Sequence, residues 1–367
     1  MKIFLIAGEE SADIHGSNMI RHLKKMADFS LYGTGGTRLK SLGQEQYFDI
    51  NQMTIIGLDE ILKKSSLIFN MFKTLKNKLI EKNPDLVILI DYPGFNLRFA
   101  KIAKKLGFKV AYYIAPQVWA WHYSRVKKIR EYVELVLCIL PFEEELFKKE
   151  GINAKYVGNP IIDNIMIKYK SKAEFKKDFS LDKKITIGIL PGSRRKEINN
   201  LMPEIIKAYE TLKDKYDFVL ARASNVDKSL IEHYTQNTSI KVLDDKNYDV
   251  MKYSDLLWIC SGTATLEAAI LQTPMILLYK VGKITEFLGR IVIKTNFIGL
   301  PNIIADKQII PELIQGEMNS DNILHHTNQI LKNEINIKDD LKQLSNYFLN
   351  LNPSENAAKE IYSLLVK

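Results

Sequence analysis

The sequence predicts an α/β protein built from two Rossmann-like lobes that face a central cleft. Short apolar runs alternate with amphipathic helical patterns, first from residue 2 onward and again from residue 185 onward. Each series opens with a strand, a glycine-containing turn and then a helix, which is the first unit of a doubly wound parallel sheet. The length of 367 residues is enough for two hydrophobic cores.

The domain boundaries follow from this alternation. We expect an N-terminal domain over residues 1–167, a C-terminal domain over 168–345 and a final segment over 346–367. Residues 168–184 are rich in lysine and poor in large apolar side chains. That composition suits a linker between the domains.

Strands and helices can be placed along both lobes. In the first lobe, strands are predicted at residues 2–7, 86–90, 109–114, 134–139 and 154–157. In the second lobe, strands are predicted at residues 185–190, 217–222, 240–243, 256–260 and 275–279. Gly33, Gly35 and Gly36 predict a flexible turn in the first lobe. The last helix is predicted to start at Asn352 and Pro353.

The composition is that of a soluble globular protein, with 46% hydrophobic and 26% charged residues. The apolar run at the N-terminus is too short for a signal peptide, and no charge-free apolar segment approaches the ~18 residues of a membrane-spanning helix. We therefore expect a cytoplasmic protein. The net charge of +9 favours a polyanion or an anionic membrane surface as a partner, although a solvated lysine-rich surface explains it equally well.

Residues 55–82 show the pattern of a basic amphipathic helix, in which lysines surround an apolar stripe. The stripe consists of Ile68, Met71, Phe72, Leu75 and Leu79. Leu67 and Phe69 fall outside it. Two interpretations remain open: a helix that lies in a membrane interface, or a helix that packs on the core and exposes its lysines.

Asp91 is the first candidate for chemistry. It follows a buried strand and precedes a turn marked by Pro93 and Gly94. Ligands of open α/β sheets sit beyond the carboxyl ends of the strands, so this carboxylate lies on the binding side. Asp91 is a candidate general base, and the alternative is a strand-end aspartate that caps its own loop. Trp119 and Trp121 follow the next strand, where they would stack on a sugar, line an acyl groove or pack in the core.

Two strand–helix turns in the second lobe are suited to a diphosphate. Residues 190–195, Leu-Pro-Gly-Ser-Arg-Arg, combine a helix start with a hydroxyl and two guanidinium groups. Residues 261–265, Ser-Gly-Thr-Ala-Thr, repeat this arrangement, and Glu267 follows where a carboxylate can accept the hydroxyls of a ribose. Solvated turns and a partner for the helix dipole are the alternative interpretations. The six histidines show no metal-ligand spacing, so neither a metal nor another cofactor is expected.

Six motifs in this order together resemble lipid-A-disaccharide synthase, a family of inverting glycosyltransferases of the GT-B type. The resemblance covers nearly the whole chain. The motifs are Ala7-Gly8-Glu9-x-Ser11, Asp91-Tyr92-Pro93-x-Phe95-Asn96, Pro116-x-Val118-Trp119-Ala120-Trp121, Leu190-Pro191-Gly192-Ser193-Arg194, Ser261-Gly262-Thr263-Ala264-x-Leu266-Glu267 and Leu300-Pro301-Asn302. The family usually reads AGExSGD, whereas Ala12 stands here in place of the second glycine, and alanine resists a positive φ.

The resemblance implies a reaction of lipid A (lipopolysaccharide) biosynthesis. Family members join UDP-2,3-diacylglucosamine to 2,3-diacylglucosamine 1-phosphate (lipid X), which gives the β-1,6-linked lipid A disaccharide 1-phosphate and UDP. The first domain would then bind the acceptor and its lipid chains, the second would bind the UDP-sugar, and the final helix would return to the first domain. Family members associate peripherally with the inner membrane, and some are domain-swapped homodimers.

The resemblance also implies roles for individual residues. Asp91 matches the proposed base of the family, and Glu9 matches a second important carboxylate. The residues expected to bind UDP are Gly192, Ser193, Arg194, Ser261, Gly262, Thr263 and Glu267. The residues expected to contact the acceptor or its acyl chains are Asn96, Gln117, Trp119, Trp121 and Asn302.

Two other functions remain open. One is an enzyme like UDP-N-acetylglucosamine 2-epimerase, which shares the two-lobe fold but needs no lipid contact. The other is a catalytically silent protein that binds lipid or nucleotide, against which the intact Asp91 and Glu9 argue. Nucleic-acid binding is less favoured, because the lysines are scattered and the aromatic residues do not form a stacking platform. For a membrane surface, the candidate contacts are residues 55–82 and the basic, apolar stretch 280–294.

Overall fold

The computed structural model describes residues 1–54, 65–120, 122–282, 295–333 and 337–366. The chain forms two compact units, each with its own parallel sheet. The first unit contains Met1–Asp163 together with Leu351–Lys367, and the second contains Asn164–Asn350. The boundaries therefore fall after residues 163 and 350, whereas the sequence predicted them after 167 and 345.

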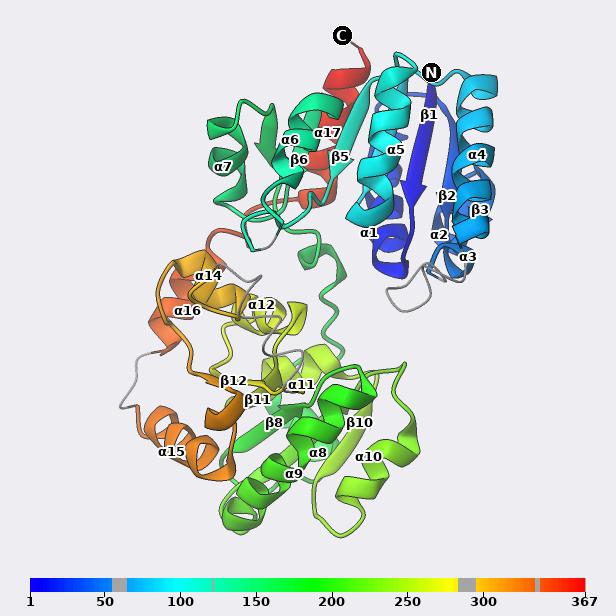
Figure 1. Ribbon diagram of the computed structural model, residues 1–367. Coiled ribbons are helices and arrows are strands. Elements are labelled where there is room, and N and C mark those ends of the chain that lie inside the picture. The colour runs from blue at the N-terminus through cyan, green and yellow to red at the C-terminus, as the bar shows by residue number, and fades with distance from the viewer. Residues whose placement is uncertain (55–64, 121, 283–294, 334–336, 367) are drawn as a thin grey trace. The chain divides into compact units, whose positions relative to one another are not determined.

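The first unit is built on a seven-stranded parallel sheet (Figure 1). Its strands are β1 (Lys2–Ala7), β2 (Ser30–Gly35), β3 (Gln44–Asp49), β4 (Leu86–Ile90), β5 (Val110–Tyr113), β6 (Leu135–Cys138) and β7 (Ala154–Tyr156). Their order across the sheet is β3-β2-β1-β4-β5-β6-β7. The direction of winding therefore reverses between β1 and β4, which pair in parallel.

The prediction of a flexible turn at Gly33, Gly35 and Gly36 was wrong. Gly33 and Gly35 lie within β2, and Gly36 caps the start of α2 (Thr37–Ser41). Gly33 has a φ of 134°, and a side chain at this position would overlap the carbonyl oxygen of Leu5 in β1. Glycine is required here because two strand backbones approach closely, which is a reason for glycine inside a strand.

Helices cover both faces of this sheet. On one face, α1 (Glu10–Leu23) and α17 (Pro353–Leu365) pack against the sheet and against each other. Ala357, Ala358 and Ile361 of α17 are buried in this core, which places the C-terminal helix in the first unit. The opposite face packs against α4 (Ser65–Lys82), α5 (Pro93–Lys105), α6 (Arg125–Tyr132) and α7 (Glu143–Lys149).

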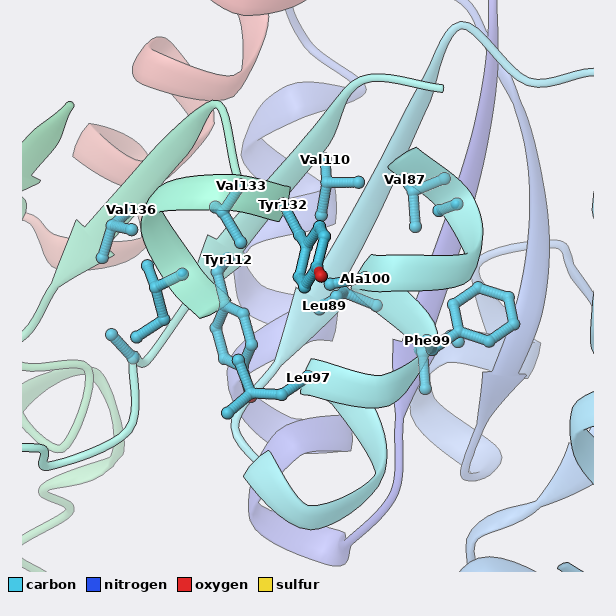
Figure 2. Close-up of a cluster of buried hydrophobic side chains, with 14 of the residues drawn as sticks. Val87, Leu89, Leu97, Phe99, Ala100, Val110, Tyr112, Tyr132, Val133 and Val136 are labelled. Atoms are coloured by element: carbon cyan, nitrogen blue, oxygen red, sulfur yellow. The ribbon is translucent and has the colours of Figure 1, made fainter. Parts of the chain in front are cut away.

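Figure 2 shows the core between the sheet and α5 and α6. Side chains of the strands, among them Leu89 and Tyr112, meet Leu97 and Phe99 of α5. Tyr112 is fully buried, yet its hydroxyl group donates a hydrogen bond of 2.6 Å to the backbone carbonyl of Asp91. This hydrogen bond connects the core to the end of β4, where the candidate base Asp91 lies.

Helix α4 is the described part of the predicted amphipathic segment, and residues 55–64 lie outside the described residues. Three residues of the stripe are at most 1% exposed: Met71, Leu75 and Leu79. The interpretation of a helix that packs on the core is therefore confirmed for α4. Leu67 and Phe69 are nevertheless 40% and 68% exposed, so the start of α4 also carries apolar surface.

The second unit is built on a six-stranded parallel sheet. Its strands are β8 (Thr186–Leu190), β9 (Asp217–Arg222), β10 (Lys241–Asp244), β11 (Leu256–Cys260), β12 (Met275–Tyr279) and β13 (Glu312–Ile314). Their order is β10-β9-β8-β11-β12-β13, which reverses between β8 and β11. The helices are α8 (Lys172–Asp178), α9 (Arg195–Leu212), α10 (Lys228–Thr235), α11 (Asn247–Tyr253), α12 (Thr263–Ile270), α14 (Leu300–Ala305), α15 (Ser320–Leu331) and α16 (Ile337–Ser345).

The prediction of a linker over residues 168–184 was wrong. This stretch contains α8, and Phe175 of that helix is fully buried. The Phe175 ring contacts the rings of Tyr169, Phe179 and Tyr253 at centroid distances of 5.2–5.5 Å. The lysine-rich composition of the stretch does not indicate this aromatic cluster. Its packing makes the stretch part of the second unit.

Candidate functional site

The two carboxylates predicted to be catalytic stand at the point where the first sheet reverses. Glu9 follows β1 and caps the start of α1, and Asp91 follows β4 directly. Ala7 and Ile90 are partners in the register of these strands. A reversal of strand order opens a crevice beyond the carboxyl ends of the two strands, which is where open α/β sheets bind ligands.

Asp91 is held in a strained backbone turn. Asp91 and Tyr92 have φ values of 46° and 48°, in the left-handed region. That conformation costs an L-residue about 1–2 kcal/mol, so the surrounding structure must enforce it. The Asp91 carbonyl accepts hydrogen bonds from the Tyr112 hydroxyl at 2.6 Å and the Asn96 amide at 2.7 Å, and the Asp91 amide donates to Tyr113 at 3.0 Å.

Gly8 fits against the same turn. A Cβ atom at this position would lie 2.5 Å from Cδ1 of the Tyr92 ring. The glycine before Glu9 therefore lets the β1 end approach the β4 end. The Tyr92 hydroxyl donates to the Met53 carbonyl at 3.0 Å, which fixes the ring from its other side.

The environment raises the pKa of Asp91 to about 6. Burial is the larger cause, because it disfavours the charged form, and the negative charge of Glu9 adds to it. A hydrogen bond with the Tyr92 backbone acts in the opposite direction and is outweighed. A carboxylate with this pKa is mostly ionised at pH 7 and still basic enough to take a proton from a hydroxyl group.

Asn96 and Ala12 have structural positions. Asn96 is fully buried, and its amide donates to the Ile90 and Asp91 carbonyls at 3.0 and 2.7 Å. This position supports a role in building the Asp91 turn rather than in contacting an acceptor. Ala12 lies inside α1 and is 1% exposed, so the alanine stands at a helical position that needs no positive φ.

The Trp119 side chain is hydrogen-bonded to a buried carboxylate. Its indole N–H donates to Glu143 Oε1 at 3.0 Å, and its ring meets Phe142 edge-on at a centroid distance of 5.3 Å. Burial raises the pKa of Glu143 to about 7, and hydrogen bonds from Trp119 and from the Leu140 and Ile139 amides counteract this. Gln117 is exposed, and Trp121 lies outside the described residues.

A cavity of about 430 Å³ lies at the reversal of the second sheet, beyond β8 and β11. All the residues predicted to bind UDP line it: Gly192, Ser193, Arg194, Ser261, Gly262, Thr263 and Glu267. Residues that follow β8 and residues that follow β11, far apart in sequence, thus meet in one cavity.

The start of α12 is open to this cavity. Gly262 caps the helix with a φ of 153°, and as a glycine it has no side chain that could accept a hydrogen bond from the first amides of the helix. A Cβ atom on Gly262 would have nothing within 4 Å. The amides of the first turn and the positive end of the helix dipole favour an anion here.

At the start of α9, two backbone amides already have a partner within the protein. The Glu197 carboxylate accepts hydrogen bonds from the amides of Ser193 and Arg194 at 3.1 and 3.2 Å. The same carboxylate pairs with the Arg194 guanidinium at 3.0 Å. Arg195, the second arginine of the motif, pairs with Asp227 at 2.9 Å.

Glu267 lines the cavity and is hydrogen-bonded to a tyrosine. The Tyr248 hydroxyl donates to Glu267 Oε1 at 3.1 Å. Burial raises the pKa of Glu267, and the Tyr248 hydrogen bond partly offsets this. The tyrosine therefore orients the carboxylate that was predicted to accept ribose hydroxyls.

The structure does not place Asn302 in the cavity. Asn302 is fully buried, and its amide donates to Ile310 O at 2.9 Å and Glu312 Oε1 at 2.7 Å. Its side-chain oxygen Oδ1 accepts from the backbone amides of Ile309 and Ile310 at 2.7 and 2.9 Å. This network supports a structural role, in holding the segment that leads to β13.

Sequence reasoning missed Tyr112, Glu197 and Tyr248. Tyr112 is concealed within an apolar strand, and Tyr248 is 19 residues from its partner Glu267. Glu197 carried a signal, because a glutamate three residues after a helix cap is typical of a capping box.

The position of Asp91 beside Glu9 predicts a measurable titration. We expect carbon-detected NMR of the aspartate carboxyl carbons to give Asp91 a pKa of about 6. Glu9→Gln should lower this pKa because it removes a negative charge, yet leave it above 3.8 because burial remains. Glu10→Gln, at a side chain that is 61% exposed, is the control and should leave it unchanged. A pKa near 3.8 in the unaltered protein would contradict the geometry.

Comparison with known proteins identifies a family. A family model described as lipid-A-disaccharide synthetase matches residues 3–366. The lipid-A-disaccharide synthase of Geobacter metallireducens is 38% identical over 329 residues, which cover 88% of this chain and 85% of that protein. The synthase of Coxiella burnetii is 36% identical over 371 residues, which cover 99% and 98%.

Solved structures of other proteins share the fold. The Staphylococcus aureus structure titled MnaA-UDP co-structure has a TM-score of 0.65 at 17% identity and covers 98% of this chain and 95% of its own. The UDP-GlcNAc 2-epimerase of Neisseria meningitidis, bound to UDP-GlcNAc, has a TM-score of 0.63 at 15% identity with complete coverage of both chains. At such identities the likeness shows the GT-B fold alone. The family model and the relatives decide the family: the chain belongs to the lipid-A-disaccharide synthetases, which are glycosyltransferases.

Proposed function

We propose that the protein transfers a diacylglucosaminyl group from UDP-2,3-diacylglucosamine to the 6-hydroxyl group of 2,3-diacylglucosamine 1-phosphate. The proposal is supported by two features: a cavity suited to UDP and a candidate general base. The seven residues expected to bind UDP line one cavity of the second unit, and a carboxylate with a pKa of about 6 stands at the first sheet's reversal.

The reaction is a direct displacement at the anomeric carbon. Asp91 takes the proton of the acceptor's 6-hydroxyl group as that oxygen forms a bond to C1 of the donor sugar. The bond between C1 and the phosphate oxygen breaks, and the electron pair leaves with UDP. Attack from the face opposite the leaving group inverts the anomeric centre and gives the β-linked disaccharide. Glu9 contributes by keeping the pKa of Asp91 raised.

The second unit stabilises the departing diphosphate. The Arg194 guanidinium provides a charge-assisted donor. The start of α12 provides amides and a positive dipole end. Because this start is fixed before the substrate binds, the negative charge that develops on UDP meets an environment that needs no reorganisation. Glu267, oriented by Tyr248, is placed to accept the ribose hydroxyls.

The acyl chains of both substrates favour a membrane contact on the first unit. Leu67 and Phe69 expose apolar surface at the start of α4, whose outer face carries Lys73 and Lys76. Apolar side chains flanked by lysines are suited to an interface with anionic lipid. None of the helices in the described ranges is long and apolar enough to cross a membrane. Of the second candidate contact, 280–294, residues 283–294 lie outside the described part.

Replacing the base tests the proposed reaction. Asp91→Asn should lower kcat by about 10³-fold, because the amide cannot take the proton. The Kd for UDP should be unchanged, because the nucleotide cavity is built from the second unit alone. Turnover of the two acylated sugars and calorimetric UDP binding measure the two effects. Asp28→Asn, at an exposed position of the first unit, is the control. Full activity in Asp91→Asn would rule out Asp91 as the base.

Removing apolar surface from α4 tests the membrane contact. In co-sedimentation with vesicles that contain anionic phospholipid, Leu67→Ser combined with Phe69→Ser should weaken binding by about tenfold or more, since each buried apolar side chain contributes about 1.5–3 kcal/mol. Met166→Ser and Leu349→Ser remove apolar side chains that are 69% and 49% exposed in the second unit, and should have no effect. Equal binding by all variants would remove α4 from the proposed contact.

A further inference from the structure

Glu197 lies in the first turn of α9 and lines the nucleotide cavity. One of its oxygens, Oε2, accepts from the amides of Ser193 and Arg194 at 3.1 and 3.2 Å. The other, Oε1, accepts from the Arg194 guanidinium at 3.0 Å. The amides that were expected to bind phosphate therefore bind a carboxylate of the protein itself.

The turn at residues 192–194 packs closely against the Glu197 carboxylate. Gly192 has a φ of 106°, and a Cβ atom there would lie 2.6 Å from Glu197 Oε2. Only glycine combines this backbone conformation with such a close approach. From the other side, the Asn225 amide donates to the Ser193 carbonyl at 3.0 Å. The shape of the turn, and with it the position of Arg194, depends on an acceptor at Glu197.

Whereas the acceptor oxygen of Glu197 shapes the turn, the negative charge of its carboxylate repels the diphosphate of a nucleotide. The carboxylates of Glu197 and Glu267 line the cavity together with the Arg194 guanidinium, and a diphosphate adds further negative charge. The Arg194 side chain is 81% exposed, whereas that of Glu197 is 20% exposed. Ion pairs with a solvent-exposed partner are weak. Arg194 can therefore leave Glu197 for a more highly charged partner while the turn keeps its hydrogen bonds.

We propose that Glu197 is a positioning residue of the nucleotide site. Its acceptor oxygen folds the turn at residues 192–194, and the diphosphate of the nucleotide takes the Arg194 guanidinium from it. The phosphates then lie between Arg194 and the start of α12, and the amides at the start of α9 remain with Glu197. This inference rests on the proposed function, because it requires a UDP-sugar in the cavity.

The test separates the acceptor from the charge. Glu197→Ala removes both, whereas Glu197→Gln keeps an acceptor oxygen and removes the charge. Glu174 offers a matched control, because it caps α8 in the same unit: its carboxylate accepts from the Lys170 amide at 2.9 Å, and its own amide donates to Ser171 Oγ at 3.1 Å. Glu174→Ala therefore removes a comparable cap outside the cavity, and Glu174→Gln keeps the acceptor oxygen there and removes the charge.

Calorimetric titration of each full-length variant with UDP gives the result. We expect Glu197→Ala to raise the Kd about tenfold or more, which corresponds to about 1.4 kcal/mol or more. Glu197→Gln should restore affinity to within about threefold of the unaltered protein, because neutral acceptors satisfy the same amides. The two Glu174 variants should bind as the unaltered protein does. Circular dichroism and melting curves compare the folding of the two alanine variants.

Two outcomes would overturn the inference. Unchanged or tighter UDP binding by Glu197→Ala would mean that Glu197 merely occupies the amides. Binding by Glu197→Gln as weak as that of Glu197→Ala would mean that the negative charge itself is required. Both outcomes presuppose that the unaltered protein binds UDP, so they leave the proposed function intact. Absence of UDP binding by the unaltered protein would instead contradict the proposed function and the inference together.

Discussion

The reversal of strand order in each parallel sheet is the constraint on which the candidate sites depend. At a reversal, the helices that follow two neighbouring strands pack on opposite faces, so the chain diverges beyond the strand ends and leaves space for a ligand. In the first unit the reversal lies between the paired strands β1 and β4 and brings Glu9 and Asp91 together. In the second unit the reversal lies between β8 and β11, where the residues expected to bind UDP line a cavity. Backbone topology therefore places the candidate base in one unit and the residues expected to bind the leaving group in the other.

The hydrophobic cores do more than stabilise the sheets. Tyr112 packs in the core of the first unit, and its hydroxyl group helps to hold Asp91 in a left-handed conformation. The buried Asn96 amide contributes from α5. Two different elements thus enforce a backbone geometry that an isolated turn would not keep. In the second unit, Tyr248 and Glu197 play comparable parts by orienting Glu267 and Arg194.

Much of the fold could be predicted from the sequence, because its signals are local. A short apolar run followed by glycine and a helical pattern marks each strand and the turn beyond it, and residues of two such turns line one cavity. Gly33 shows the limit of this reasoning. It was predicted to lie in a turn. Glycine is required there because the backbone of Leu5 lies too close for a side chain, and Leu5 is its neighbour only in the folded sheet.

The details of the site depended on side-chain partners that sequence order does not reveal. Asn96 and Asn302 stand in motifs and are polar, which favoured ligand contacts, yet both are fully buried and their side-chain N–H groups donate to backbone carbonyls. The turn before α9 was expected to bind a diphosphate, and only the conformation of Glu197 shows that the amides of Ser193 and Arg194 already bind a carboxylate. Polar residues in a motif can thus serve the shape of a site rather than its ligand.

The most direct test of the account is a mass spectrum of the products formed from UDP-2,3-diacylglucosamine and 2,3-diacylglucosamine 1-phosphate. The proposed transfer gives a tetraacylated disaccharide 1-phosphate and an equal amount of UDP, with no other nucleotide product. Release of UDP without the disaccharide, or recovery of both substrates at unchanged mass after incubation with the folded protein, would contradict it.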